Sequence, residues 1–263
     1  MKPTARTRLA LCLSAIVMMS GCGTSLTSLY PRLAPYKPSM ASGALLADCV
    51  IVDDMMGDTN KVDLILNKSM GGMILTYFSD RMEGKGYHID NDILTSVGLA
   101  MDRNQVYKVA QSIRSRELNQ EDLPVALPPF YLNEIFNSDS AAGNLRETYD
   151  ALVHTTSRSE GSASYVPSAA SVGKQTGAET LLIILLGGFN VAPSEQLGDE
   201  ITSDLGTIGK VAGQRVSQVT VAFYILDSRT GELLWADQRI AQGGTVYKEK
   251  ILLLADKILD ALP

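Results

Sequence analysis

The side chains best suited to chemistry are few in this sequence and lie far apart. The chain of 263 residues contains two histidines, His88 and His154, and three cysteines. A zinc site built from several His and Cys ligands therefore has too few ligands, and we expect no cofactor and no metal. The sequence contains no nucleophile elbow, Walker A loop, H-E-x-x-H helix or dinucleotide fingerprint. We expect no catalytic residues and no enzymatic activity.

Acidic residues cluster after the first apolar run, where Asp53, Asp54 and Asp58 lie close to Gly57. Oxygen-rich turns of this kind can hold a cation, but the spacing does not match an EF-hand loop. Capping of the following helix is the other explanation, because a carboxylate accepts hydrogen bonds from the first N–H groups of a helix. We favour the capping role.

The N-terminus has the pattern of a secretory signal. Three basic residues precede the apolar stretch 9–19, which is too short to span a bilayer as a mature helix. The segment then ends in Met19-Ser20-Gly21-Cys22, which resembles the lipobox of bacterial lipoproteins, although Leu is the usual residue where Met19 stands. A plain cleaved signal peptide with an accidental cysteine, or an uncleaved anchor, is the alternative.

The lipobox resemblance implies that residues 1–21 are removed and that Cys22 carries palmitate and further acyl chains. Two or three chains anchor a protein stably, since each buried methylene contributes roughly 0.8 kcal/mol. Gly23 follows Cys22, whereas Asp at that place resembles a signal for retention in the inner membrane. We therefore expect a protein anchored by its lipid to the outer membrane and facing the periplasm.

The mature chain is acidic. Cleavage removes three of 23 basic residues and none of 29 acidic ones, so the net charge changes from −6 to −9. No stripe rich in Lys and Arg occurs, which argues against nucleic acid as a partner. Cys49 is the one cysteine after Cys22, so no disulfide can form within the mature chain. It lies in the apolar run 44–52, where a buried structural thiol is expected.

Composition and patterning divide the mature chain into a tether and a body. Residues 22–43 are rich in Gly, Ser, Thr and Pro and predict a lipidated flexible tether. Residues 44–263 predict a single α/β domain with flexible insertions near 137–172, including a short helix around 145–153, and near 191–216. Strands are predicted at 45–53, from 87–89 onward, and at 180–186, 216–226 and 232–241. Helices are predicted at 67–85, 103–117 and 246–262.

Two short segments carry a second resemblance. The sequences GAETLLII, which starts at Gly177, and LDSRTGELLWA, which starts at Leu226, resemble the signature of envelope lipoproteins with a fold like the N-terminal domain of TolB. That group includes the curli-secretion channel and the lipoprotein activators of penicillin-binding proteins. The resemblance implies an α/β sandwich in which helices pack on a mixed β-sheet. Trp235 is expected to pack against the sheet, and a role in binding is the alternative.

The segment between these two motifs separates the family analogies. In the curli channel it is a membrane-spanning β-hairpin, which requires alternation of apolar and polar residues. Residues 191–216 do not alternate, and charged side chains are spread along them. Four apolar residues recur instead at helical spacing, namely Leu197, Ile201, Leu205 and Ile208. This apolar stripe predicts an amphipathic helix that contacts protein or membrane, and a flexible surface loop is the alternative.

These features favour a non-enzymatic outer-membrane lipoprotein that acts by protein–protein contacts. Its expected role is assembly or regulation of a cell-envelope machine, such as a secretion or surface-appendage apparatus. Its partners would be the membrane, through the N-terminal lipid, other envelope proteins, and copies of itself in a homo-oligomer. The alternatives are a periplasmic activator of a peptidoglycan synthase, or a ligand-binding or hydrolytic lipoprotein with an unrecognised site.

Overall fold

The computed structural model describes residues 42–54, 60–101, 128–155, 165–191 and 217–263. Within these ranges, seven strands form one mixed sheet in the order β4-β3-β1-β5-β6-β7, and β2 pairs with the end of β1. The strands are β1 (Gly43–Asp54), β2 (Asn60–Val62), β3 (Asn91–Val97), β4 (Tyr131–Leu132), β5 (Thr180–Val191), β6 (Gln218–Asp227) and β7 (Glu232–Gln242). The helices are α3 (Leu64–Gly84), the 3-10 helix η3 (Glu134–Phe136), α5 (Asp139–Thr155), α6 (Ala169–Thr176) and α7 (Lys248–Ala261).

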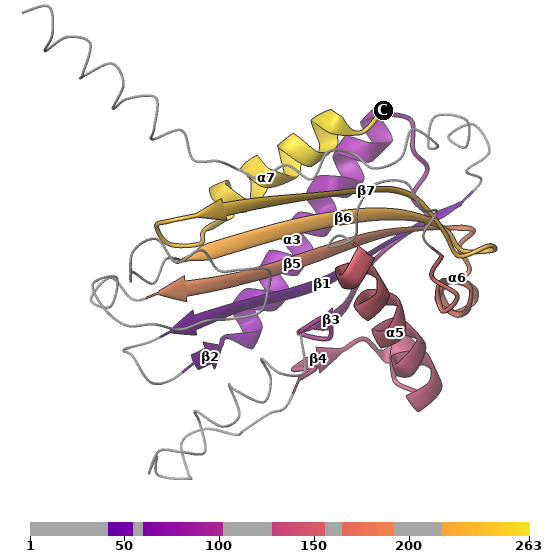
Figure 1. The fold of residues 1–263 in the computed structure, drawn as a ribbon, viewed down its shortest axis with the longest axis horizontal. Helices are drawn as coiled ribbons and strands as arrows, with labels where there is room; N and C mark the ends of the chain where they lie inside the picture. The colour runs from indigo at the N-terminus through magenta and orange to yellow at the C-terminus, as the bar shows by residue number, and fades with distance from the viewer. Residues whose placement is uncertain (1–41, 55–59, 102–127, 156–164, 192–216) are drawn as a thin grey trace, which may run out of the picture.

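Helices cover both faces of this sheet, as Figure 1 shows. The three central strands β3, β1 and β5 are parallel, and β6 and β7 continue the sheet antiparallel. The connection from β1 to β3 passes through α3, which packs with α7 on one face. The connection from β3 to β5 passes through α5 and α6 on the other face. The predicted α/β class, with helices packed on a mixed sheet, is confirmed.

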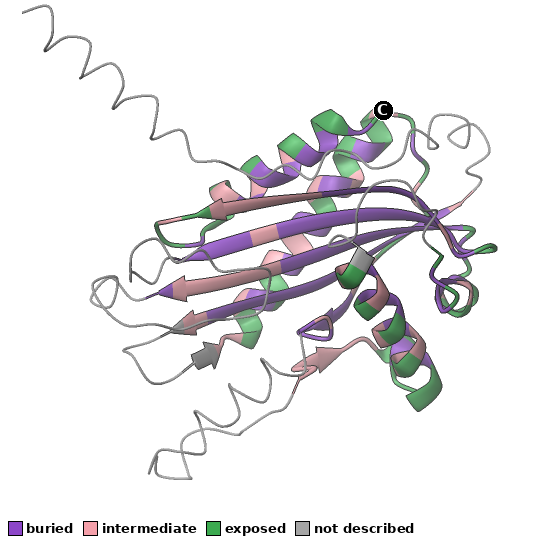
Figure 2. Cartoon of the chain, viewed as in Figure 1, coloured by how far each residue is buried: buried purple, intermediate pink, exposed green. Residues whose placement is uncertain are grey.

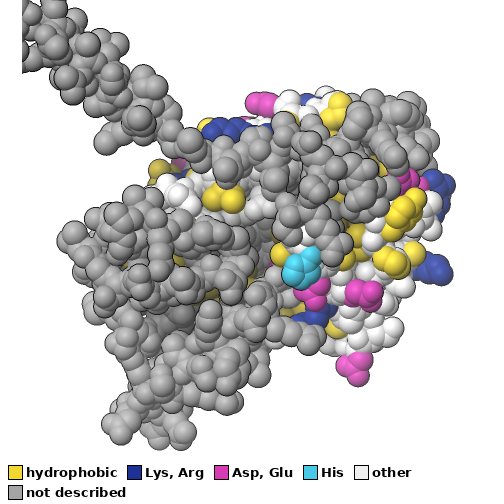
Figure 3. All heavy atoms as spheres, in the orientation of Figure 1, with side chains coloured by type: hydrophobic (Ala, Val, Ile, Leu, Met, Phe, Trp, Pro, Cys, Tyr) yellow, Lys and Arg dark blue, Asp and Glu magenta, His cyan; other side chains and the backbone are white. Residues whose placement is uncertain are grey.

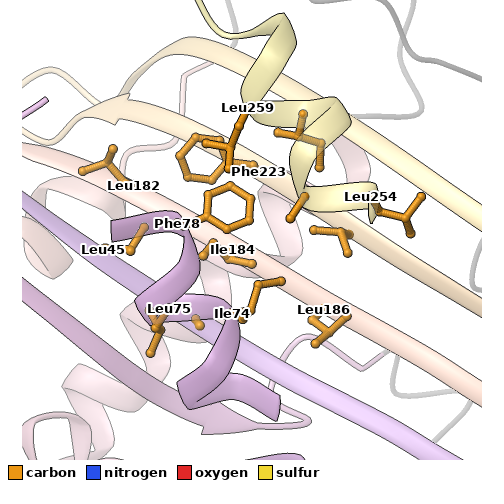
Figure 4. Packing of buried hydrophobic residues seen from close by; sticks show 14 of the residues in the cluster. Leu45, Ile74, Leu75, Phe78, Leu182, Ile184, Leu186, Phe223, Leu254 and Leu259 are labelled. Carbon is orange, nitrogen blue, oxygen red and sulfur yellow. The ribbon is translucent and has the colours of Figure 1, made fainter. Parts of the chain in front are cut away.

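Strand β5 explains how one continuous apolar run serves two cores. Leu182, Ile184 and Leu186 face α3 and α7, while the alternate residues face α5 and α6. A strand buried on both faces needs no polar side. In the first core, the ring of Phe223 lies 4.8 Å from that of Phe78 (Figure 4). Leu182, Ile184 and Phe223 thus share one core.

The sequence prediction was wrong about the second strand. Residues 87–89 form no strand, and β3 begins at Asn91. Tyr87 is buried in the core, and its hydroxyl donates a hydrogen bond to the carbonyl oxygen of Pro263 at 3.1 Å. The backbone hydrogen bond that joins this region to β1 runs from Asp90 N to Gly43 O at 2.8 Å. Tyr87 therefore packs near the end of α7, and the strand begins further along the chain, at Asn91.

The segment 137–172 is not a surface insertion in its described part. It contains α5 and the start of α6, and Figure 2 shows that these helices bury one side and expose the other. Leu145, Tyr149 and Leu152 are fully buried and help build the second core. Many small and polar residues lie between these three, and this composition led to the prediction of a flexible insertion. The predicted helix 103–117 and most of the segment 191–216 lie outside the described residues.

Two glycines in the motifs resembling TolB-like lipoproteins have structural reasons. Gly177 ends α6 with a φ of 72°, a left-handed conformation that glycine adopts without strain, and the chain then enters β5. Gly231 has a φ of 75° in the turn between β6 and β7. A Cβ there would lie 2.6 Å from the carbonyl oxygen of Val166. Both positions therefore depend on glycine for local geometry.

Candidate functional site: the carboxyl end of the sheet

The lipidation residue and the apolar stripe are not placed by the structure. Cys22, Leu197, Ile201, Leu205 and Ile208 all lie outside the described residues. The two residues that flank segment 192–216 are described, however, and they lie together. The backbone N–H of Val191, at the end of β5, donates to Ser217 Oγ at 2.9 Å. The segment therefore leaves and rejoins the sheet at one place.

This place is the carboxyl end of the three parallel strands. Chain segments outside the described residues follow β1 at 55–59, the turn after β3 at 102–127, and β5 at 192–216. The connection from β1 to β3 crosses one face of the sheet, and the connection from β3 to β5 crosses the other. In open α/β sheets such a switch between faces marks the usual place for binding, at the carboxyl ends of the strands. We therefore treat this end as the candidate functional site.

A polar network ties the strand ends to the loop before α7. Asn190 Nδ2 donates to Asp53 Oδ1 at 2.7 Å, and Asn190 Oδ1 accepts from Val246 N at 2.6 Å. One carboxamide thus joins β1, β5 and the loop before α7. Close by, Ser217 O accepts from Gly243 N at 2.8 Å. Lys250 Nζ donates to the carbonyl oxygen of Gly243, and partial burial lowers the pKa of this lysine.

The acidic residues near this end do not act as expected. Asp53 accepts from Asn190 and does not cap the following helix. Asp63 caps α3 instead, because its Oδ1 accepts from Leu66 N at 3.0 Å. The side chains of Asp54 and Asp58 lie outside the part of the molecule that is described. Within that part, no three His, Cys, Asp or Glu side chains are grouped closely enough to hold a metal ion.

Exposed apolar side chains flank the same end of the sheet. Ile65 is 84% exposed and Leu64 is 37% exposed at the start of α3. Phe189 on β5 is partly buried and packs with a small cluster around Val52. We call the set Asp53, Leu64, Ile65, Phe189 and Asn190 the strand-end surface. Its apolar residues and hydrogen-bonding groups are of the kind found at protein–protein contacts.

On the face that Figure 3 shows, the side chains of the described residues form no large patch of one kind. Acidic, basic and apolar side chains are interspersed there. His88 is an exposed residue whose Nε2 lies 2.9 Å from Asp90 Oδ1. His154 lies near the end of α5 and belongs to a different part of the fold. The two histidines therefore do not form a common site.

Trp235 and Cys49 are both core residues. Trp235 is 1% exposed, and its ring meets that of Phe223 edge-on with 5.8 Å between centroids. This burial agrees with the packing role and leaves the indole no surface for binding a partner. Cys49 is fully buried, and burial raises the pKa of its thiol. A thiol held in its protonated form is a poor nucleophile, so the expectation of a structural cysteine is confirmed.

The most unusual buried group is Asp48, which sequence reasoning did not single out. Its carboxylate accepts hydrogen bonds from Ser96 Oγ at 2.7 Å, Leu99 N at 3.1 Å and Ala100 N at 2.9 Å. Burial raises the pKa of this carboxyl, and the hydrogen bonds oppose the rise. Both oxygens have donors from the chain itself. Asp48 therefore closes the sheet where β3 turns away from β1, which is a structural role.

A register shift accompanies this buried carboxylate. Ala47 pairs with Leu94 and Asp48 pairs with Ser96, so Thr95 is the extra residue of a bulge. Thr95 Oγ1 donates to Ala47 O at 2.7 Å and lies 2.6 Å from the hydroxyl of Tyr149. An available signal was that Asp48 is the one charged residue within the apolar run 44–52.

Comparison with known proteins yields distant structural likeness alone. No protein family model matches the chain, and no curated protein sequence does. Similar solved structures include a dodecamer of a PelC point variant from Paraburkholderia phytofirmans, with 10% identity, 91% of this chain and 97% of that chain covered, and a TM-score of 0.33. Another is lipoprotein GNA1162 from Neisseria meningitidis, with 11% identity, 84% and 94% coverage, and a TM-score of 0.30. Among the described residues, no helix combines the length and apolarity needed to cross a membrane.

Proposed function

We propose that this protein is a lipoprotein of the outer membrane that faces the periplasm and acts without catalysis, through contacts with other proteins of a cell-envelope machine. The observation that carries the proposal is the N-terminal sequence, in which basic and apolar stretches end at Cys22. A secretion or surface-appendage apparatus is the kind of machine we favour. The two motifs around Gly177 and Gly231 support membership in the group of lipoproteins with a TolB-like fold.

The position of the tether is compatible with contact between the strand-end surface and other proteins. The tether joins the body at Gly43, at the amino end of β1, and the strand-end surface lies at the opposite end. A strand of 12 residues at about 3.3 Å per residue separates these two ends by roughly 40 Å. The stretch 23–42 could also extend to roughly 70 Å. Lipid attachment therefore leaves the strand-end surface free to meet partners away from the membrane.

The two residues that flank the segment with the apolar stripe lie at the same end of the molecule. These residues are Val191 and Ser217, and both lie beside the polar network around Asn190. Leu197, Ile201, Leu205 and Ile208 would form an unshielded apolar row on a helix unless they contacted protein. We propose that this row and the strand-end surface bind the same partner.

Metabolic labelling with palmitate tests the anchor. Cys22→Ala should lose the label and should no longer fractionate with the outer membrane. Cys12→Ala is the matched control, because Cys12 lies within the segment that is removed. The control should keep its label. Labelling that persists in Cys22→Ala would refute lipidation at this residue.

Site-specific photocrosslinking in intact cells tests the contact surface. A photoreactive residue at Ile65 or Ile201 should form a defined adduct with an envelope protein. The same residue at Leu253, which is 56% exposed on α7, is the control and should not form that adduct. Ile201→Asp together with Leu205→Asp should lose partner capture while the lipidated protein stays folded. Equal crosslinking from all positions would overturn the proposed surface.

A further inference from the structure

Strand β7 forms one edge of the sheet, and among the described residues no strand pairs with most of its outer side. It pairs with β6 along its whole length. On the outer side, the structure records for the described residues one isolated bridge, between Tyr165 and Glu232. The part from Asp237 to Gln242 has no described strand beside it. An unpaired edge of this kind is a template for addition of a strand from another molecule.

Two charged side chains on this edge point inward. Asp237 pairs with Phe223 and Arg239 pairs with Val221, and both of these partners belong to the core under α3 and α7. Cross-strand partners share a face of the sheet, so Asp237 and Arg239 lie on the covered face. The Asp237 side chain is 0% exposed, and that of Arg239 is 20% exposed. A buried charge at the sheet edge is costly unless it has a function or a partner.

The pair satisfies its own charges within β7. Arg239 Nη2 donates to Asp237 Oδ2 at 2.6 Å, and Arg239 Nε donates to the same oxygen at 3.0 Å. Burial raises the pKa of Asp237, whereas the guanidinium beside it lowers that pKa. The charged form of Asp237 is therefore stabilised by the guanidinium of Arg239 beside it.

The same carboxylate also engages the backbone. The N–H of Gln238 donates to Asp237 Oδ1 at 2.8 Å. In an antiparallel ladder, an N–H points either to the neighbouring strand or away from it. This N–H is therefore supplied with an acceptor by its own strand. An incoming strand would have to displace Asp237 and bring its backbone against Arg239.

We propose that Asp237 and Arg239 keep the outer edge of β7 closed to pairing with β7 of a second copy of this chain. Two identical edges could otherwise meet antiparallel across a two-fold axis and join the two sheets into one. Inward-pointing charges are a known means by which sheets avoid this association. Any homo-oligomer of the protein then forms through surfaces other than β7.

The test removes the pair and measures mass in solution. The mature chain with Cys22→Ser serves as the parent, and Asp237→Thr with Arg239→Thr opens the edge, because threonine favours strands. Sedimentation velocity over a range of concentrations should show a new species with about twice the mass of the parent species. Arg81→Gln with Asp260→Asn is the control, since it removes an exposed ion pair 3.5 Å long without a change in net charge. The control should keep the parent mass.

A proline substitution in β7 distinguishes association through the strand edge from nonspecific association. The Gln238 N–H donates to Asp237, so Gln238→Pro removes a backbone donor of β7 and should block strand addition. Added to the double variant, it should restore the parent mass. Fluorescence of Trp235, which is buried on β7, verifies folding in every variant. If the double variant unfolds, Asp237→Asn with Arg239→Gln, which removes both charges and keeps polar side chains, replaces it.

Three results would overturn the proposal. A folded double variant with the mass of the parent at all concentrations would show that the pair does not guard the edge. A fall in mass relative to the parent would show that the pair joins copies together. Doubling that persists in the proline variant would also contradict pairing through β7.

Discussion

Asn67 allows a test of how the sheet is completed. Its carboxamide makes the hydrogen bonds to β1 that a neighbouring strand would otherwise make. Beside β1, strand β3 pairs as far as Asp48, and β2 begins to pair at Val52. In the gap, Ile51 N donates to Asn67 Oδ1 at 2.5 Å and Asn67 Nδ2 donates to Ile51 O at 3.1 Å. Both residues are buried. Asn67→Ala would leave the N–H and the carbonyl of Ile51 without these partners.

The expected loss follows from these two groups. Each buried polar group left without a hydrogen bond costs about 1–3 kcal/mol, so the variant should lose roughly 2–6 kcal/mol of unfolding free energy. Asp63 O adds little, because it loses Asn67 Nδ2 at 2.8 Å but keeps the helical bond from Asn67 N at 2.9 Å. A loss of this size is a large share of the roughly 5–15 kcal/mol that stabilises a typical domain.

Urea denaturation followed by Trp235 fluorescence measures this loss. Thr76→Ala is the control in the same helix, because Thr76 is exposed and its hydroxyl bonds within α3, to Gly72 O. Exposed substitutions of this kind change stability by about 0.5 kcal/mol or less. A loss below about 1 kcal/mol in Asn67→Ala, with an unchanged denaturant slope, would refute the view that this carboxamide completes the sheet.

Three further outcomes are expected from the same denaturation assay. Phe223→Ala should lose about 3–5 kcal/mol through its cavity in the core, and a loss typical of surface positions would contradict the packing in Figure 4. Gly173→Ala should destabilise the protein, because its Cβ would lie 2.4 Å from Ser228 Cβ, whereas Gly143→Ala meets no described atom within 4 Å and should gain up to about 1 kcal/mol. Destabilisation by both would argue against the close approach of α6 to the turn. Burial raises the pKa of Asp48, so the stability of the parent relative to Asp48→Asn should be greatest below about pH 4 and fall as pH rises through the folded pKa. A difference that grows with pH would contradict the direction of that shift.

Local pattern was sufficient for the elements marked by a contiguous apolar run, by turn residues or by apolar residues at helical spacing. The apolar run 180–186 and the turn chemistry around Gly231 predicted β5 and the β6–β7 hairpin, because strand period and turn residues are local properties. The helices α3 and α7 followed from apolar residues at spacings of three and four. Helices α5 and α6 were missed in large part, because small residues such as Gly173 permit close packing without producing an apolar pattern.

The class of the fold was thus determined by the sequence itself, and the N-terminal export signal is a prediction that likewise depends on contiguous residues. The roles of Asp48 and Asn67 were decided by tertiary structure alone. Asp48 binds the backbone of Leu99 and Ala100, about fifty residues away in the chain, and Asn67 binds Ile51 across the gap in the sheet. A polar side chain carries no local mark of such a partner. Its environment exists after the chain has folded, when strand order and register decide which backbone groups lack a neighbour.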